Sequence, residues 1–405
     1  MPYRYAVAVS GGSDSMALAR LAAAHQQAGL ADVVAFTVDH GLRHGSDKEA
    51  ALVGEWCASA GLCHHILAWH GDKPKSAIQE AARNARYGLL SRAAIDHGCH
   101  AILTGHTSDD QAETVYMRLA RGAGPRGLAA MESVSHIASG AYQPVALVRP
   151  FLGVSRIGLR RALSGFGQDY INDPSNDDLA YERIRTRKTL AALSESSDIS
   201  RGALLKTAAS ARIACNHLAA EELKCFSRGG GVFYQSGPVS LNASVLGDYS
   251  VGLLLRQLLF AVSGARQPVA EEQVEALVHE CGKKGIATLS GAIIRRMGEK
   301  IWLYREPAAL LGRAGVAPIE PFLVEDGDRV LWDRRFLLHN QSGEPLEIVP
   351  SGAAGEACDM ANAPPEARMA APMVRGGQSQ PVKNRQFLLK SLVEERFFRR
   401  VNRFQ

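Results

Sequence analysis

The sequence predicts an α/β fold with a parallel, Rossmann-like sheet in its first part. Within residues 1–130, short apolar runs rich in β-branched side chains alternate with segments whose apolar residues recur at helical spacing. Strands that alternate with helices in this way form βαβ units around a parallel sheet. The predicted strands are 6–9, 33–38, 65–69 and 101–104, and the predicted helices are 14–28, 47–60, 77–97 and 108–121. Ligands of such sheets bind beyond the carboxyl ends of the strands.

A loop rich in glycine and serine separates the first strand from the first helix. Its residues are Ser10, Gly11, Gly12, Ser13, Asp14 and Ser15. A strand–loop–helix turn of this kind directs backbone N–H groups and the positive helix end at an anion. The loop lacks the lysine that phosphate loops of terminal phosphoryl transfer contain. It suits holding pyrophosphate while the α-phosphorus of a nucleotide is attacked, which is adenylation. The alternative is a plain β–α connection.

A second polar segment, 104–114, begins at a strand end and continues into a helix. It contains His106, Asp109, Asp110 and Glu113. Helix capping explains part of it, with Thr107 as N-cap and Asp110 at N3. Capping does not require the other three polar residues. Asp110 and Glu113 share one helix face, where paired carboxylates hold Mg²⁺ or a cationic amine.

Two further groups of residues lie where a nucleotide site is expected. Asp39 ends the second strand and suits orienting a ribose, a metal or an attacking amine. Arg83, Arg86 and Tyr87 share a helix face, where arginines neutralise charge that develops on phosphate. Solvated surface arginines are an equally good interpretation of that face.

Composition indicates a soluble cytoplasmic protein with several cores. The 405 residues are 46% hydrophobic, with a formal charge of +5. No apolar run reaches the length of a membrane span, and the amino terminus is not organised as a signal peptide. The seven cysteines include no C-x-x-C pair, which fits a reduced compartment. The stretch 383–405 holds seven basic and two acidic residues, a net +5 that favours contact with RNA or is a solvated terminus.

Three regions are predicted along the chain: a catalytic domain over 1–195, a mainly helical domain over 203–306 and a small α+β region over 318–405. The middle region contains helices near 203–225, 250–262 and 269–281, followed by a hairpin with strands 287–297 and 301–305. The last region is mostly strand. Its segment 351–381 is rich in glycine, alanine and proline, which predicts a flexible loop or disorder.

The motifs together resemble the PP-loop ATP pyrophosphatases, and within them the tRNA(Ile)-lysidine synthetase family. The matching motifs are SGGSDS (10–15), VDHGLR (38–43), the AR-x-x-RY helix (82–87), TGHTSDDQAET (104–114), RGAGPRGL (121–128), RPFL (149–152) and DPSNDD with RIRTR (173–187). They occur in the family's order over about half of the chain. The first motif marks only the superfamily, whereas the later ones are far more specific. Thr107 departs from a histidine that often occupies this position, so no role for a histidine carries over there.

The resemblance implies a PP-loop ATPase fold and a two-step ligation. ATP adenylates the C2 carbonyl oxygen of the wobble cytidine in a CAU-anticodon tRNA(Ile), and pyrophosphate leaves. The amine of free L-lysine then displaces AMP and forms lysidine. Mg²⁺ is the implied metal ion, and a homodimer is one of the assemblies left open.

The resemblance also implies roles for individual residues. Residues 10–15 bind ATP, and Asp39, Arg86, His106, Asp109 and Asp110 form the catalytic group. The metal ligands are Asp14 and Asp110, although the choice between Mg²⁺ and lysine for the carboxylates stays open. The residues expected to meet tRNA or lysine are Glu113, Arg121, Arg126, Arg183, Arg185 and Arg187.

Other functions fit the sequence less well. A PP-loop tRNA sulfurtransferase uses reactive or cluster-binding cysteines, and the chain has no C-x-x-C pair to supply them. A glutamine-dependent relative would need an amino-terminal glutaminase cysteine. A non-catalytic tRNA-binding protein does not need carboxylates at 109, 110 and 113 beside a phosphate site.

Overall fold

The chain folds into two compact units, Met1–Ala214 and Cys215–Gln405. The structure is a computed structural model. It describes residues 3–43, 45–71, 73–74, 76–137, 144–172, 179–180, 182–196, 199–313, 315, 317–354, 363–376 and 387–401, without the side chains of 196, 354 and 399–401. The DPSNDD motif and the basic residues 399–403 of the terminus therefore lie outside the residues whose side chains are described.

A six-stranded sheet forms the centre of the first unit, with strand order β3-β2-β1-β4-β6-β5. The strands are β1 (Arg4–Ala8), β2 (Asp32–Asp39), β3 (Cys63–Ala68), β4 (Ala101–Thr104), β5 (Val134–Ile137) and β6 (Val145–Val148). All pairs are parallel except that of β5 with β6. The chain moves outward from β1 to β3 and returns on the other side of β1 at β4. This reversal places the switch point, where such sheets bind ligands, between β1 and β4.

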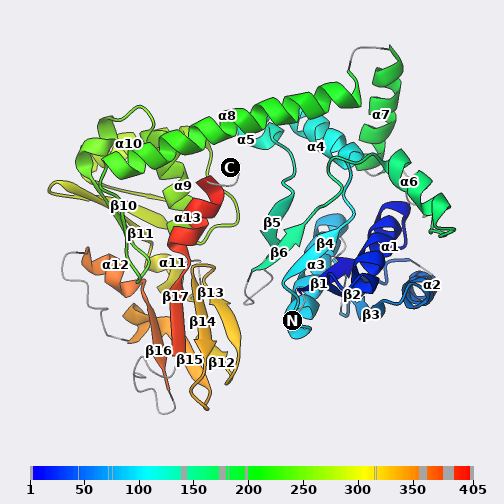
Figure 1. Cartoon of the computed structure of the whole chain (residues 1–405). Coiled ribbons are helices and arrows are strands. Elements are labelled where there is room, and N and C mark those ends of the chain that lie inside the picture. Colours follow the sequence, from blue (N-terminus) through cyan, green and yellow to red (C-terminus); the bar gives the residue numbers. More distant parts are fainter. Residues whose placement is uncertain are drawn as a thin grey trace. The chain divides into compact units, whose positions relative to one another are not determined.

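Helices cover both faces of this sheet (Figure 1). The helices of the unit are α1 (Ser13–Gln27), α2 (Ser46–Ser59), α3 (Ile78–Asp96), α4 (Ser108–Ala120), α5 (Pro125–Leu128), α6 (Arg156–Gly165), α7 (Glu182–Ser196) and the first part of α8 (Arg201–Arg228). Val7 and Val9 pack into a core with α1, α2 and α6. Ala6 and Ala8 point the other way, into a core with α3. Burial on both faces explains why β1 is a continuous apolar run.

The predicted α/β fold class is confirmed, and the eight elements predicted before residue 122 all form, with ends shifted by a few residues. These elements could be predicted because apolar residues that recur every three or four positions indicate a helix, whereas short apolar runs between turns indicate strands. The segments after β1 and β4 contain the predicted residues 10–15, His106, Asp109, Asp110 and Glu113, and they follow the carboxyl ends of adjacent strands.

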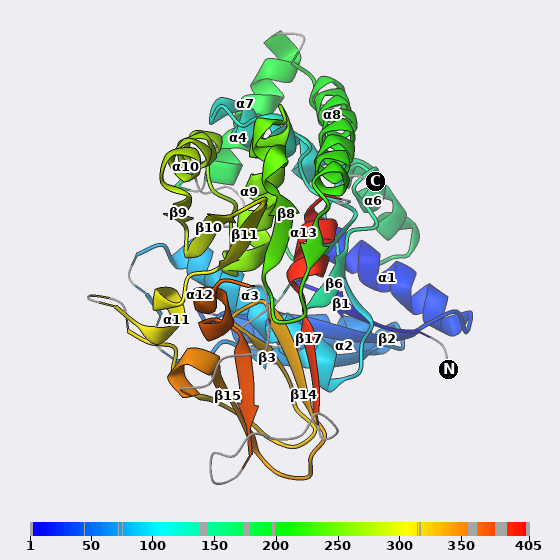
Figure 2. The ribbon, with the colours of Figure 1, turned by 90° about the vertical axis from the view of Figure 1, so that its left-hand side faces the viewer.

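The second unit contains, after the end of α8, a five-stranded sheet of order β7-β8-β11-β10-β9, and two long helices lie on one of its faces (Figure 2). Its elements are β7 (Val232–Phe233), β8 (Val239–Asn242), α9 (Val251–Ser263), α10 (Glu271–Lys284), β9 (Ile286–Leu289), β10 (Ala292–Met297) and β11 (Lys300–Arg305). Leu254 and Leu258 of α9 share one core with Ile294 and Leu303 of the sheet. The mainly helical middle region thus includes a sheet of its own.

The predicted hairpin strand 287–297 is wrong as a single strand. It is divided into β9 and β10, which pair antiparallel. Ser290 and Gly291 lie between them with φ values of 52° and 75°. Two residues in the left-handed region reverse the chain in a tight hairpin turn, so the apolar run folds back on itself.

The last part of the chain is α+β, as predicted. Its elements are α11 (Ala308–Leu311), β12 (Phe322–Val324), β13 (Arg329–Trp332), β14 (Phe336–Asn340), β15 (Leu346–Pro350), α12 (Pro365–Met369), β16 (Pro372–Arg375), β17 (Phe387–Ser391) and α13 (Val393–Val401). The strands form two three-stranded sheets, β12-β15-β16 and β13-β14-β17. The division into three domains stays a prediction.

The predicted loop or disorder over 351–381 needs correction. Part of this segment is regular, because α12 and β16 form within it. Ala367 and Val374 are buried, so small apolar side chains in a Gly/Ala/Pro-rich segment suffice for packing. Positions 355–362 and 377–381 lie outside the described residues. Among the helices that the structure describes, none has both the length and the hydropathy of a membrane span.

Candidate active site

The loop between β1 and α1 has the geometry of an anion site. Gly11 has a φ of 84°, and a Cβ at this position would lie 2.6 Å from Ile171 Cδ1, so only glycine fits. Gly12 is the N-cap of α1 and supplies no side-chain cap. The first-turn N–H groups of α1 therefore have no side-chain acceptor at the cap, and the helix dipole adds positive potential. An anion can accept these hydrogen bonds.

The serines of the loop hold its shape. The Ser10 N–H donates to Ser15 Oγ at 3.1 Å, and the Ser15 hydroxyl donates to Gly12 O at 3.0 Å. Ser13 Oγ donates to Asp14 Oδ1 at 3.1 Å. Ser15 closes the turn, whereas Ser13 lies at the first position of α1 beside the loop.

The segment after β4 lies directly against this loop. A Cβ on Gly105 would lie 2.7 Å from Asp14 O, so the missing side chain permits the approach. Thr107 is the N-cap of α4 and forms a capping box with Asp110. The Thr107 N–H and hydroxyl both donate to Asp110 Oδ2 at 2.8 Å. The capping interpretation is thus correct for one oxygen of Asp110.

The other oxygen of Asp110 binds two guanidinium groups. Asp110 Oδ1 lies 3.2 Å from Arg156 Nη2 and 3.3 Å from Arg183 Nη2. Burial alone would raise the pKa of Asp110. Arg183, the Thr107 hydrogen bonds and Arg156 outweigh burial, so the pKa lies below its ordinary 3.8. Asp110 is therefore an anion at neutral pH.

Glu113 extends this cluster along the same face of α4. Its side chain is almost completely buried. It accepts from Arg183 Nε at 2.8 Å and from Arg187 Nε at 2.9 Å. Arg156 Nη1 lies 3.7 Å from Glu113 Oε1. Two arginines of the RIRTR motif thus contact a carboxylate, as does one arginine of α6.

Asp109 connects three helices. It accepts from the Arg156 backbone N–H at 2.8 Å, at the start of α6, and from Arg201 Nη1 at 2.8 Å, at the start of α8. Both of its oxygens are occupied by these contacts. A catalytic role for Asp109 stays a prediction.

Arg156 lies at the centre of the site. Its Nε is 3.0 Å from Asp14 Oδ2 of the glycine loop, in addition to the contacts with Asp110 and Glu113. One guanidinium thus joins the anion-binding loop to the carboxylates of α4. Sequence reasoning missed this role, although the position of Arg156 in a basic stretch after the RPFL motif was its one local signal.

His106 is neutral at physiological pH. Its Nδ1 lies 2.9 Å from Thr104 Oγ1. Burial, helped by Arg149, Arg86 and Arg183, outweighs the opposing effect of Asp110 and lowers the pKa of His106 to about 4. The imidazole can therefore accept a proton or a hydrogen bond at pH 7, whereas an imidazolium is not available there.

This low pKa makes stability depend on pH. The unfolded chain binds more protons than the folded one between the pKa of about 4 and the ordinary 6.5. The free energy of unfolding should therefore fall by up to roughly 3 kcal/mol as the pH drops from 6.5 to 4. In His106→Gln this fall in the free energy of unfolding should be absent. Urea unfolding of both proteins at pH 7, 5.5 and 4.5 would measure it. The same pH dependence of stability in both proteins would contradict the lowered pKa of His106.

Asp39 is held in a local turn at the end of β2. Its Oδ1 accepts from Gly41 N–H at 2.9 Å and from Ser46 Oγ at 2.7 Å. Burial would raise the pKa of Asp39, but these hydrogen bonds outweigh it and lower the pKa. Arg86 is close enough to lower the pKa of His40 and of His106, so α3 contributes a cation at the same edge of the sheet.

The remaining predicted RNA contacts lie apart from this carboxylate cluster. Arg121 forms a two-oxygen ion pair with Glu182 at 2.6 Å. Arg185 donates to Leu179 O and to Ala180 O. Arg126 lies in the short helix α5.

Comparison with known proteins identifies the family. Residues 2–193 match the model of the PP-loop domain. A tRNA(Ile)-lysidine synthase of Ruegeria pomeroyi is 37% identical over 364 residues, which cover 87% of this chain and 81% of the relative. The chain belongs to the tRNA(Ile)-lysidine synthase family. A member from Methylobacterium nodulans is 35% identical over 76% of this chain and 91% of its own, and one from Bradyrhizobium sp. is 47% identical over 46% and 51%.

Membership in the tRNA(Ile)-lysidine synthase family agrees with the resemblance of the motifs. The PP-loop match includes both the glycine loop and the segment 104–114. A PP-loop domain uses ATP. The assignment of the loop 10–15 to nucleotide phosphate stays a prediction. The family goes against the sulfurtransferase and the non-catalytic interpretations of the sequence.

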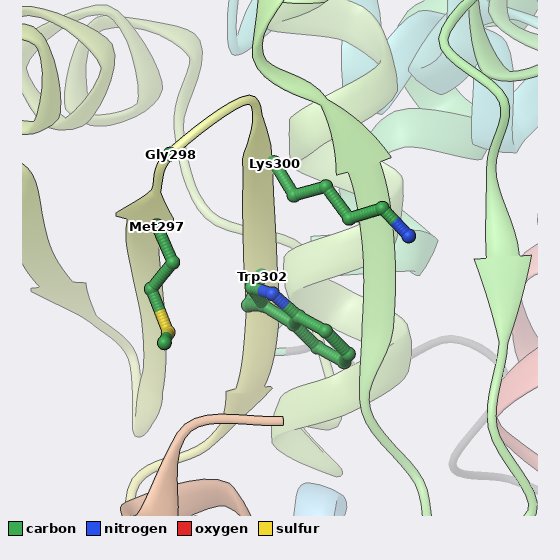
Figure 3. Close-up of a pocket in the computed structure, with 4 residues that line it drawn as sticks. All are labelled: Met297, Gly298, Lys300 and Trp302. Carbon is green, nitrogen blue, oxygen red and sulfur yellow. The ribbon is translucent and has the colours of Figure 1, made fainter. Parts of the chain in front are cut away.

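The second unit contains a pocket of its own. It is lined by Met297, Gly298, Lys300 and Trp302, at the end of the β10–β11 hairpin (Figure 3). Its lining offers one amine, and no carboxylate, thiol or hydroxyl. The lining therefore contains no pair of a nucleophile and a base.

The carboxylates suit a magnesium ion held jointly with phosphate. Asp14 and Asp110 both contact the guanidinium of Arg156, so both carboxylates line the same site. Within the described residues, no group of three or more His, Cys, Asp or Glu side chains is placed to hold a metal. Mg²⁺ commonly uses one or two carboxylates and completes its shell with phosphates and water. The residues present therefore fit a nucleotide-bound Mg²⁺.

Proposed function

We propose that this chain ligates free lysine to C2 of the wobble cytidine of a CAU-anticodon tRNA(Ile), with ATP converted to AMP and pyrophosphate. Family membership supports the reaction. The observation that carries it is that an anion-binding loop lies beside carboxylates that bind cationic groups, with Asp14, Asp110 and Glu113 converging on one guanidinium. ATP is an anion and lysine is a cation, so the two kinds of site are the ones the reaction needs.

The proposed reaction has two steps. The C2 carbonyl oxygen of the cytidine attacks the α-phosphorus of ATP, and pyrophosphate leaves with the bridging oxygen. The amine of lysine then attacks C2, loses a proton, and displaces AMP, which takes the former carbonyl oxygen with it.

Residue roles follow from charge and position. The loop 10–15 holds the phosphates, and Arg86 and neutral His106 lie toward the α-phosphate. Glu113 binds an amino group of lysine, in place of its present arginine partners. Asp14 is a proposed ligand of Mg²⁺, which when bound would neutralise phosphate charge, and Asp110 binds either this Mg²⁺ or the amino group of lysine. Arg121, Arg126 of α5 and the arginines of α7 contact tRNA.

The test is a product assay with purified full-length protein. AMP and pyrophosphate should accumulate over many turnovers only when ATP, lysine and the CAU-anticodon tRNA are all present. The control RNA is the same tRNA with its wobble cytidine replaced by uridine, which should give no turnover. Formation of ADP, or continued turnover without lysine, would contradict the proposed reaction.

Two further properties belong to the proposal. A tRNA substrate places the protein in the cytoplasm. A homodimer is the assembly to be checked, by sedimentation velocity of the full chain.

A further inference from the structure

Helix α6 supplies two arginines to a phosphate loop that has no lysine. The helix packs along α1, and its N-cap Ser155 accepts from Gly158 N–H at 3.2 Å. Arg156 and Arg160 lie one turn apart on it, so both face α1. Arg156 contacts Asp14, and Arg160 Nε lies 3.5 Å from Ser13 Oγ.

The two arginines differ in how their charge is balanced. The side chain of Arg156 is mostly buried, and its guanidinium lies near three carboxylates. Arg160 is exposed, and within the described residues no carboxylate lies in ion-pair distance of it. Its guanidinium carbon is 5.8 Å from the centre of the Tyr170 ring, a cation–π contact. Arg160 is therefore an available cation beside Ser13.

A cation at this place has a specific use in adenylation. When the α-phosphorus is attacked, the bond to the bridging oxygen breaks and its electron pair leaves on pyrophosphate. A guanidinium that donates to the β- and γ-phosphate oxygens stabilises that charge without any proton transfer. Phosphate loops with a lysine place their own cation at the outer phosphates.

We propose that Arg160 binds the β,γ-diphosphate of ATP and the pyrophosphate that leaves, in the place of the lysine that the loop lacks. This inference rests on the proposed adenylation. The residue that contacts the leaving pyrophosphate would then lie almost 150 positions beyond the loop, outside the glycine motif.

The experiment measures binding of inorganic pyrophosphate with Mg²⁺ to the full chain by calorimetry, without tRNA or lysine. Arg160→Ala should raise the Kd about tenfold or more, as expected for loss of a charged hydrogen bond. Arg160→Lys should recover part of the affinity. Arg161→Ala is the matched control, since it removes the same charge from the next residue of α6, and it should stay within about twofold of the parent.

A second readout separates this role from a structural one. Arg160→Ala should raise the KM for ATP and lower kcat for AMP formation, with the KM for lysine unchanged. Equal pyrophosphate affinity in Arg160→Ala and Arg161→Ala would overturn the proposal, as would a parent protein that does not bind pyrophosphate. A selective loss of tRNA affinity with a flatter salt dependence would also overturn it and assign Arg160 to RNA backbone. If pyrophosphate binding depends on Arg160 but no lysidine forms, the proposed function fails and this inference stands.

Discussion

Asp110→Asn is expected to lower the rate of lysidine formation by roughly two or more orders of magnitude in a protein that still folds. Asparagine keeps the size of the side chain and an oxygen that can accept from Thr107, so the start of α4 should persist. The carboxylate charge is lost, and with it the group that faces Arg156 and Arg183 at 3.2 and 3.3 Å. The amino group of lysine, or Mg²⁺, would then have no anion at this position.

Thr107→Ala is the matched control for Asp110→Asn. It removes the hydroxyl that caps α4 and keeps the charge of Asp110, so it should cost about 1 kcal/mol of stability with little loss of rate. The measurements are AMP formation at saturating substrates and urea unfolding at pH 7. If Asp110→Asn is folded and retains more than a tenth of the rate, the role of Asp110 is structural and not catalytic.

The pH dependence gives an independent check on the same residue. The lowered pKa of Asp110 means that its charge stabilises the fold above its ordinary pKa of 3.8, and that this contribution disappears as the pH falls through the lower folded value. The difference in the free energy of unfolding between the parent and Asp110→Asn should therefore be largest near pH 7 and should decrease as the pH falls below about 3.8.

The local parts of the site could be predicted from the sequence. Glycine at 11 and at 105, and a capping residue at 107, act over a few neighbouring residues, and the rule for parallel sheets then brings the ends of β1 and β4 together. The capping box also shows why residue type alone left two interpretations of Asp110. One oxygen caps the helix and the other binds guanidinium, so both interpretations describe the same side chain.

The cationic half of the site could not be predicted in this way. Arg156 pairs with Asp14 across 142 positions and with Asp110 across 46. Such pairs arise only when α6, α1 and α4 pack together, and no local period encodes them. Within the RIRTR motif, the sequence treats three arginines alike. Arg183 and Arg187 contact Glu113, whereas Arg185 donates to nearby backbone carbonyls, because it points away from α4.

Arg156→Ala is expected to destabilise the first unit by about 3 kcal/mol at pH 7, because breaking an enclosed ion pair leaves its partner charges uncompensated. Asp14 loses its arginine partner, and three carboxylates then face one another with less positive charge between them. Burial would lower the pKa of Arg156, but Asp110 and Asp14 outweigh it and raise the pKa, which is the sign of a cation that its site stabilises. Arg156→Lys should recover only part of the lost stability, since one ammonium cannot replace the planar guanidinium that contacts three carboxylates.

Arg201→Ala is the comparison that makes the Arg156 prediction decisive. Arg201 also pairs with a carboxylate of α4, Asp109, but its side chain is 46% exposed, so its removal should cost less than about 1 kcal/mol. Urea unfolding of both variants should separate them at pH 7. As the pH falls below 3.8, the ordinary pKa of Asp110, protonation of Asp110 relieves part of the repulsion that Arg156→Ala creates, and the stability difference from the parent should shrink. Equal effects of the two variants, or a loss in Arg156→Ala that does not change with pH, would show that Arg156 does not hold these carboxylates together.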